Sequence, residues 1–429
     1  MANLVLGRIV SDIGDSNYSV IMDETSDIAK IEQECLNFIL NGQKRESFVG
    51  FCDTKRTNAP ALLDLLKRAT TSLNLEISKI VGECFDGASN MSGEHAGLSA
   101  LMKGVAPLSL YVHCYAHRLN LAIEDSLSSI ECLRNGLGTI QSLYVFIGSS
   151  AKRWADFNDT EIEGDVINLT LKSQSETRWS CRYEAVKAVD DQFERIVKSL
   201  IKLKNDDQSK AKPRAEARSL LTAICTFDFV LSLLILKFIL LNTNALSRYY
   251  QGKQVDVLNA IRNADMTIST FQSCREDAQF DLMWERAILL ADKVKSWLSD
   301  EAPEVEFADA ALPRIRLPSR RHQALVGEDH TNQSAQPLNA KSFYRIKYFA
   351  SLDAVIGELV YRFQGEDNDL VCNLGRVCLD ANVNYETMQT IANYYGVEID
   401  VLETEHRLFK KFLESHENIF AETRPICVF

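Results

Sequence analysis

The sequence predicts an α/β core of five strands, followed by a larger all-helical body. Two observations lead to this fold class. Short runs with the alternation or apolar content of strands, separated by turn residues, fall between residues 18 and 114. After about residue 130 such runs stop, and apolar residues recur every three or four positions, which is the helical spacing.

The core begins with three strand-like runs, and a helix follows them. Asn58 begins this helix, Pro60 suits its first turn, and leucines at positions 62, 63, 65 and 66 form its apolar stripe. The elements expected in the core are, in order, strands at 18–22, 33–40 and 46–53, the helix from Asn58, a strand at 77–85, a helix at 90–103, a strand at 108–114 and a helix at 116–128.

The helical body sets the expected domain organisation. Helical patterns cover residues 140–146, 182–204, 214–250, 255–271 and 278–298. Residues 301–337 are polar and irregular, as in an exposed loop, and helices resume at 342–363 and continue less clearly to 420. We therefore expect four parts: a core at 1–130, a helical insertion at 131–300, an exposed polar loop at 301–341 and a C-terminal helical region at 342–429.

Composition narrows the classes of function. The chain carries 59 acidic and 47 basic residues, a net charge of −12, which repels phosphate backbones, so any contact with DNA requires a local basic patch. The most apolar window, residues 219–241, is interrupted by Asp228 and Lys237, and we expect a buried helix here rather than a membrane span. The cysteines are scattered, without a Cys-x-x-Cys pair or a signal peptide, which favours free thiols in a reducing compartment.

Asp23 and Asp86 are the candidate catalytic and metal-binding residues, because each closes a predicted strand. Mg²⁺ and Mn²⁺ prefer carboxylate oxygens, and two such ions can activate the attacking group and stabilise the leaving oxygen in phosphodiester cleavage. Asp27, in the following turn, and Asp53, at the end of the third strand, are weaker alternatives. The structural alternative is that the two aspartates cap turns and bind no metal.

Three short motifs carry a family resemblance. They are Asp86–Met91 (Asp-Gly-Ala-Ser-Asn-Met), Tyr111–Leu121 (Tyr-Val-His-Cys-Tyr-Ala-His-Arg-Leu-Asn-Leu) and Thr177–Ser180 (Thr-Arg-Trp-Ser). With them the sequence resembles the hAT superfamily of DNA transposases, and more closely the domesticated zinc finger MYM-type protein 1-like proteins, which carry a DUF4371-type ribonuclease-H-like domain. The resemblance continues through Phe343–Asp353 and Ile356–Phe363. It implies a ribonuclease-H-like mixed five-stranded sheet, metal ligands at Asp23 and Asp86, and a nuclear protein.

The resemblance also implies a third carboxylate, a Glu in a C-terminal Ser-Glu-Arg type motif on a segment that serves dimerisation. The sequence ends at Arg424–Phe429, where that segment is expected to begin. Glu358 and Glu386 lie on predicted helices but in no matching motif, and no Cys/His pairing of the family's zinc finger precedes Asp23. We therefore expect a vestigial aspartate pair in a chain shortened at both ends.

Cys114 and His117 form a Cys-x-x-His motif, and His113 lies beside it. These residue types bind zinc, but a closed zinc site needs four ligands and the sequence offers no second Cys/His pair. The interpretation that we favour is that His117 donates a buried hydrogen bond and Cys114 packs as a small apolar residue.

The resemblance points to a DNA contact at Arg178 and Trp179. In hAT transposases a Trp in this motif stacks on a base flipped from the duplex, and Arg178 would neutralise a neighbouring phosphate. The alternative, which we favour, is that Trp179 anchors the helical insertion against the core. The arginines at 314, 316, 320 and 321 are a weaker candidate for DNA contact or nuclear localisation, since acidic residues at 301–309 lie beside them.

These observations predict a transposase-derived protein that is catalytically inactive and acts by binding DNA or protein. One alternative is an active metal-dependent nuclease or strand transferase, which requires a third carboxylate within about 5 Å of both aspartates. Another is an interaction scaffold that presents the apolar helices around residues 220–241. The expected partners are DNA and other proteins, without a membrane or a small-molecule substrate, and the expected metal is Mg²⁺ or Mn²⁺.

Overall fold

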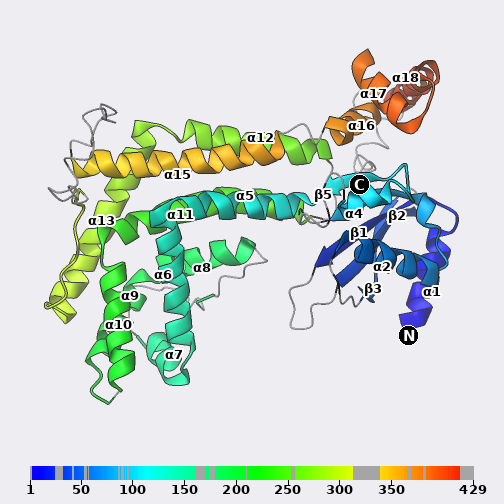
Figure 1. Ribbon diagram of the computed structural model, residues 1–429. Helices are drawn as coiled ribbons and strands as arrows, with labels where there is room; N and C mark the ends of the chain where they lie inside the picture. Colours follow the sequence, from blue (N-terminus) through cyan, green and yellow to red (C-terminus); the bar gives the residue numbers. More distant parts are fainter. Residues whose placement is uncertain are drawn as a thin grey trace, which may run out of the picture. The chain divides into compact units, whose positions relative to one another are not determined.

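The computed structural model consists mostly of helices, with a small sheet near the N-terminus (Figure 1). It describes residues 2–24, 32–40, 43–52, 56, 58–85, 87, 91, 93, 96–160, 171–172, 179–208, 210–252, 257–312, 339–364, 369–379 and 383–415. The chain divides into two compact units. The first contains Met1–Ala122, Leu246–Met266 and Leu359–Phe429, and the second contains Ile123–Ala245 and Thr267–Glu358.

This grouping differs from the linear division at residues 130, 300 and 341. Sequence periodicity identifies a helix but not its packing partner, so it does not show which distant segments belong to one unit. Four helices contribute residues to both units: α5 (Tyr115–Ser129), α11 (Phe227–Tyr250), α12 (Val257–Ser273) and α15 (Ala340–Phe363).

The first unit contains the sheet. Its strands are β1 (Tyr18–Glu24), β2 (Glu32–Leu40), β3 (Gln43–Cys52), β4 (Ile80–Phe85) and β5 (Leu110–His113), in the spatial order β3-β2-β1-β4-β5. β1, β4 and β5 run parallel to one another. β2 pairs antiparallel with β1, and β3 pairs antiparallel with β2 at the edge of the sheet. Tyr18, Val20 and Met22 alternate along β1 and are buried, which defines the core face of the sheet.

Helix α2 (Ala59–Ser72) supplies leucines to the same core. Asn58 caps it by accepting a hydrogen bond from the Ala61 backbone N–H at 3.1 Å, as expected for this residue type. Leu62, Leu65 and Leu66 are buried in one cluster with the core-face side chains of β1. The apolar stripe read from the sequence is therefore the buried face of the helix.

Three local features of this unit differ from the sequence-based expectation. Ala2–Ile13 form helix α1, which was not predicted; Ile13 is buried in the core cluster and apolar neighbours pack against it. The expected strand at 77–85 begins with a 3₁₀ turn, η1 (Ile77–Lys79), so β4 starts at Ile80. Within the expected helix at 90–103, the named helix is α4 (Leu98–Met102).

Three helices follow in the C-terminal part of the first unit: α16 (Asp369–Leu379), α17 (Tyr385–Tyr395) and α18 (Ile399–Ser415). Val377, Met388 and Ile391 form a small core between them. Gly396 ends α17 in the left-handed conformation, with φ 65°, where a glycine is favoured. The Tyr394 hydroxyl donates a 2.8 Å hydrogen bond to the Ser109 carbonyl, which joins α17 to the segment before β5.

The second unit is helical. In the described part of residues 131–300 the regular elements are all helices: α6 (Glu131–Gly148), α7 (Ala151–Asn158), α8 (Trp179–Asp191), α9 (Phe193–Asn205), α10 (Ala211–Ile224), α11, α12 and α13 (Asp277–Glu301). Figure 1 shows α6 to α10 gathered together.

Two long helical patterns are each divided in the structure. The pattern at 182–204 is divided at Gln192, and the pattern at 214–250 is divided at Cys225 and Thr226. At the second break the Phe227 N–H donates to the Ala308 carbonyl at 2.8 Å, and the Ala308 N–H donates to the Cys225 carbonyl at 3.0 Å. This pairing with a distant segment replaces helical hydrogen bonds, which periodicity alone does not reveal.

Helix α11 is the apolar helix of the second unit. It is long and apolar enough to cross a membrane, but 72% of its apolar window is buried inside the protein. Two of its charged residues form ion pairs, Lys237 with Asp190 and Asp191, and Asp228 with Lys347 at 2.5 Å. The burial agrees with the expected core helix. The leucines between 220 and 240 are buried, whereas Leu241, at the end of the range named in the scaffold hypothesis, is 50% exposed, so that hypothesis stays a prediction.

The polar segment after α13 is only partly exposed. Within its described part, residues 302–312, most residues are exposed, as expected for a loop, whereas Ala302 and Phe307 are buried. Glu304 of the acidic run pairs with Lys204. Residues 313–338, which hold the arginine run, lie outside the described residues.

Candidate functional site

The candidate carboxylate site lies where β1 ends. β1 and β4 are neighbouring parallel strands, with Ile21 paired to Cys84. Asp23 follows Ile21 by two residues, and Asp86 follows Cys84 by two residues in the sequence. Since parallel neighbours advance in step, this register leads both strands to the same edge of the sheet.

The backbone also shows which face of the sheet carries the Asp23 position. Tyr18, Val20 and Met22 lie on the core face, so the odd-numbered positions of β1 lie on the opposite face. Asp23 is paired with Gln33 on β2, and Gln33 is paired with Phe51 on β3. We call this opposite side of the sheet the outer face; Phe51 on it is 60% exposed.

Several predicted site residues lie outside the described part of the structure. They are Asp86, Asp27, Asp53, Arg178 and the side chains of Asp23 and Trp179, of which Trp179 begins α8. The aspartate pair and the DNA contact at Arg178 and Trp179 therefore stay predictions.

Glu83 is a buried acidic residue of the sheet that the sequence reading missed. It is paired with Val20, which places it on the core face, and it is 2% exposed. Burial raises the pKa of its carboxyl to about 7, although the Ser109 side chain and the positive charge of Lys103 act in the opposite direction. The sequence feature that could have identified this buried carboxylate is an acidic residue inside the apolar run of β4. Because Glu83 faces the core, it cannot complete a metal site with Asp23 on the outer face.

The first two sequence motifs meet beside β5. A side chain added at Gly87, in the Asp86 motif, would overlap with the imidazole ring of His113, so this contact requires a glycine. Next to His113, the Cys114 N–H donates to the Phe85 carbonyl at 3.1 Å, and the Cys114 carbonyl accepts from the Arg118 N–H at 2.9 Å. Cys114 thus connects β5 to the first turn of α5.

His113 and His117 are close neighbours, with ring centroids 5.7 Å apart. Burial, together with the positive charge of Arg118, lowers the pKa of His113 to about 3, so its imidazole is neutral at physiological pH. Among the described residues, no group of three or more His, Cys, Asp and Glu side chains is arranged to hold a metal ion. Cys114 and His117 are among these described residues, whereas Asp86 and the side chain of Asp23 are not.

Arg118, from the same motif, lies in an aromatic cluster that the sequence reading also missed. Tyr115, Tyr250 and Phe363 come from α5, α11 and α15, and their ring centroids are 5.7 to 6.1 Å apart. The Arg118 guanidinium lies 5.6 Å from the Phe363 ring centroid and donates a hydrogen bond to the Arg362 carbonyl. The motif therefore has a packing role: it joins three helices within the first unit.

The two glutamates considered for the third carboxylate lie on helices. Glu386 is exposed in the first turn of α17, and Glu358 lies on α15 in the second unit. Both stay unassigned.

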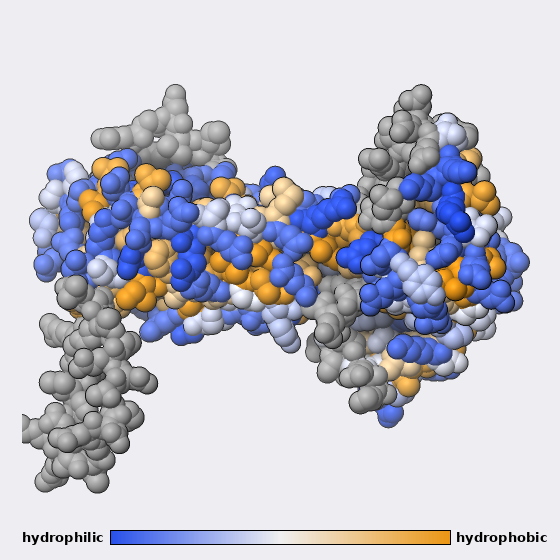
Figure 2. All heavy atoms as spheres, turned by 90° about the horizontal axis from the view of Figure 1, so that it is seen from above, coloured by the Kyte–Doolittle hydropathy of each residue, from blue (hydrophilic) through white to orange (hydrophobic). Residues whose placement is uncertain are grey.

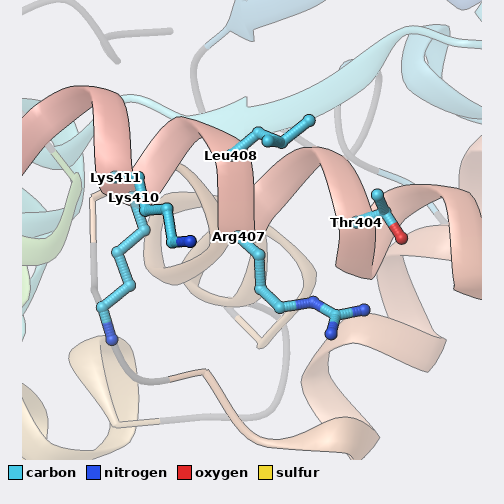
Figure 3. A pocket seen from close by; sticks show the side chains of 5 residues that line it. All are labelled: Thr404, Arg407, Leu408, Lys410 and Lys411. Carbon is cyan, nitrogen blue, oxygen red and sulfur yellow. The ribbon is translucent and has the colours of Figure 1, made fainter.

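A basic hollow lies on α18 (Figure 3). Its volume is about 470 Å³, and its lining residues are Thr404, Arg407, Leu408, Lys410 and Lys411. Figure 3 shows Arg407 and Lys411 extending to the same side of the helix, with Leu408 on the other side. This gives the acidic chain a local concentration of positive charge.

Two known domain families match the chain in succession. Residues 1–97 match the family described as ZMYM1/FAM200, RNase-like domain, and residues 112–227 match the ZBED1 RNase-like helical domain. The first match covers most of the sheet, and the second covers helices from α5 to α10.

Two curated proteins share a longer similarity. The mouse protein named 52 kDa repressor of the inhibitor of the protein kinase is 24% identical over 307 residues, and the human protein of that name is 21% identical over 301 residues. Each match covers 66% of this chain and 39% of the relative. The sheet with its RNase-like domain match, the helical domain that follows and these relatives make the chain similar to hAT-transposase-derived, domesticated proteins.

Proposed function

We propose that this protein binds DNA without cutting it. The observation that carries the proposal is the placement of carboxylates in the sheet. Asp23 lies at the end of β1, and Glu83, the buried carboxylate of the neighbouring strand β4, belongs to the core face. The pair proposed at Asp23 and Asp86 would therefore act without Glu83 as a third carboxylate.

The residues suit a divalent metal in kind, since Asp23 and Asp86 would offer hard oxygen ligands to Mg²⁺ or Mn²⁺. When bound, such an ion polarises a phosphate oxygen. A pair of carboxylates holds one ion weakly, and a third is needed to fix the second ion of a two-metal site. The role proposed for the pair is therefore to hold a phosphate through a metal rather than to cleave its ester.

The proposed DNA contact has to overcome the net charge of −12. Arg407, Lys410 and Lys411 on α18 provide positive charge on one helix, and the hollow beside them is open to a phosphate group. Arg178 and Trp179 are a second proposed contact, on the resemblance of their motif alone. The relatives are named as repressors, which supports a regulatory protein of the nucleus in place of a transposase.

The test measures binding and cleavage on the same DNA. The purified chain is incubated with labelled hAT-type terminal DNA, with Mg²⁺ or Mn²⁺, and the products are separated on denaturing gels. We expect retention in a native gel shift and no nicking or strand joining above background. Metal-dependent nicking that Asp86→Ala abolishes would overturn the proposal and favour an active nuclease. Failure to bind any DNA would leave protein binding as the function.

A further inference from the structure

Two leucines lie in the middle of the solvent-facing side of helix α13. Leu282 is 62% exposed and Leu289 is 65% exposed. The buried side of the same helix is formed by Phe280, Ala287, Ala291, Val294 and Leu298. At about 3.6 residues per turn, both leucines lie roughly opposite the centre of this buried side. Apolar and polar patches are interspersed over the surface seen in Figure 2, so exposure by itself distinguishes no site, and the residues around the leucines have to be considered.

An acidic and a basic residue follow each leucine with the same spacing. Three and four positions after the leucine, the first repeat has Glu285 and Arg286, and the second has Asp292 and Lys293. All four are exposed. Around the helix axis, each acidic residue lies about 60° to one side of the preceding leucine, and each basic residue lies about 40° to the other side. The solvent face of α13 thus has an apolar centre, one acidic border and one basic border.

The charges of the first repeat find no opposite charge on their own helix. Helical ion pairs join residues three or four positions apart, and those positions around Glu285 and Arg286 hold apolar residues and the acidic Asp281. Within the described part of the chain, neither residue forms an ion pair. In the second repeat, Asp292 lies 3.6 Å from Lys295 of the same helix. The first repeat therefore presents an exposed acid and an exposed base that can pair with another molecule.

We propose that α13 is a self-association surface, against which a second copy of this chain packs its own α13 in parallel. A two-fold axis parallel to the helices brings each leucine against the same leucine of the partner subunit. It also sets the acidic border of one helix opposite the basic border of the other, so that Glu285 faces Arg286 of the partner subunit, and the reverse. An antiparallel pair would set acidic borders together and basic borders together, which is unfavourable. The charge pattern thus specifies both the partner and its orientation.

The size of the surface limits the strength of the dimer. Helix α13 has 25 residues, a length of about 37 Å, and two leucine layers. One helix from each copy makes an interface at the small end of the usual range, below about 1,200 Å² in total. We therefore expect a reversible dimer with a Kd of roughly 1 to 100 μM.

The experiment measures the mass of the full chain by sedimentation velocity over roughly that range of concentrations. We expect a monomer–dimer equilibrium, which Leu282→Ser and Leu289→Ser each weaken at least about tenfold. Leu4→Ser, which replaces a leucine that is 80% exposed on α1, is the matched control and should dimerise like the wild type. Thermal unfolding of each variant verifies that it is folded.

Charge reversal tests the proposed pairing. Glu285→Arg and Arg286→Glu should each weaken the dimer about three- to tenfold, because each sets like charges opposite one another. A mixture of the two variants should form a dimer at least as tight as that of the wild type, since the charges are then complementary again. Glu216→Arg, at an exposed position on α10, is the control for the change in net charge.

Disulfide crosslinking tests the orientation. In a parallel pair, Leu282→Cys and Leu289→Cys should each form a disulfide with the same position of the partner subunit, with the oxidised wild type as the control. An antiparallel pair brings at most one of these positions against its copy. A wild type that stays monomeric at roughly 100 μM, serine variants that dimerise like the wild type, or crosslinking at only one of the two positions would each overturn the inference.

Discussion

At the scale of single residues, the sheet holds two titratable groups with opposite effects on stability. Glu83 has a pKa raised from 4.5 to about 7, and His113 has a pKa lowered from 6.5 to about 3. Between pH 4.5 and 7 the folded state keeps the Glu83 proton that the unfolded state has released, so stability falls as pH rises. Between pH 3 and 6.5 His113 is protonated in the unfolded state but neutral in the folded state, so the contribution of His113 to stability rises with pH.

The first residue-scale prediction concerns Glu83→Gln. Removing the titrating group should make the variant progressively more stable relative to the wild type as pH rises from 4.5 to 7, by about 3 kcal/mol over that range. The measurement is the free energy of unfolding by urea at several pH values. Glu386→Gln, at an exposed position on α17, is the control and should show a difference independent of pH. A pH-independent difference for Glu83→Gln as well would mean that Glu83 is ionised in the folded protein.

At the scale of elements, Arg118 joins α5 to α15 beside an aromatic cluster that also includes Tyr250 of α11. It is 8% exposed, its guanidinium lies over the Tyr115 and Phe363 rings, and it donates to the Arg362 carbonyl. Arg118→Ala removes the cation–π contacts and leaves the partly buried Arg362 carbonyl without this donor, so we expect a loss of about 2 kcal/mol. Thermal unfolding measures it. Arg134→Ala removes an exposed hydrogen bond from an arginine of α6 to a carbonyl and should cost far less. Equal losses of stability in the two variants would contradict the stabilising role of Arg118.

At the scale of the whole molecule, an acidic chain must concentrate its positive charge to bind DNA. If Arg407 and Lys411 contact phosphates, Arg407→Ala and Lys411→Ala should each reduce the slope of log affinity against log salt by about 1. Lys212→Ala, at an exposed position on α10, is the control and should leave the slope unchanged. A slope unaffected by the α18 variants would place the DNA contact elsewhere on the chain.

Many secondary-structure elements of the first unit could be predicted from the sequence, because they depend on local chemistry. The strands at β1, β2, β3 and β5, the Asn58 cap of α2 and the helical character of the later chain all follow from alternation, capping and period, which act over a few residues. The family motifs followed in the same way, because Asp86–Met91 and Tyr111–Leu121 are short and contiguous.

Long-range contacts decided the rest. Helix α1 packs Ile13 into the core. Backbone hydrogen bonds to Ala308 separate α10 from α11, and the pairing of β1, β2 and β3 defines the outer face of the sheet. The break between α10 and α11 and the faces of the sheet do not appear in a local pattern, since the partners are far apart in the chain and meet only when it folds; α1, with Leu6, Ile9, Val10 and Ile13 at helical spacing, was open to prediction from the sequence. The sequence alone thus determined the elements and the family resemblance of this protein. The tertiary structure decided which side chains share a face: Phe51 lies with the Asp23 position, and Glu83 faces the core, because strand pairing sets the direction of every side chain.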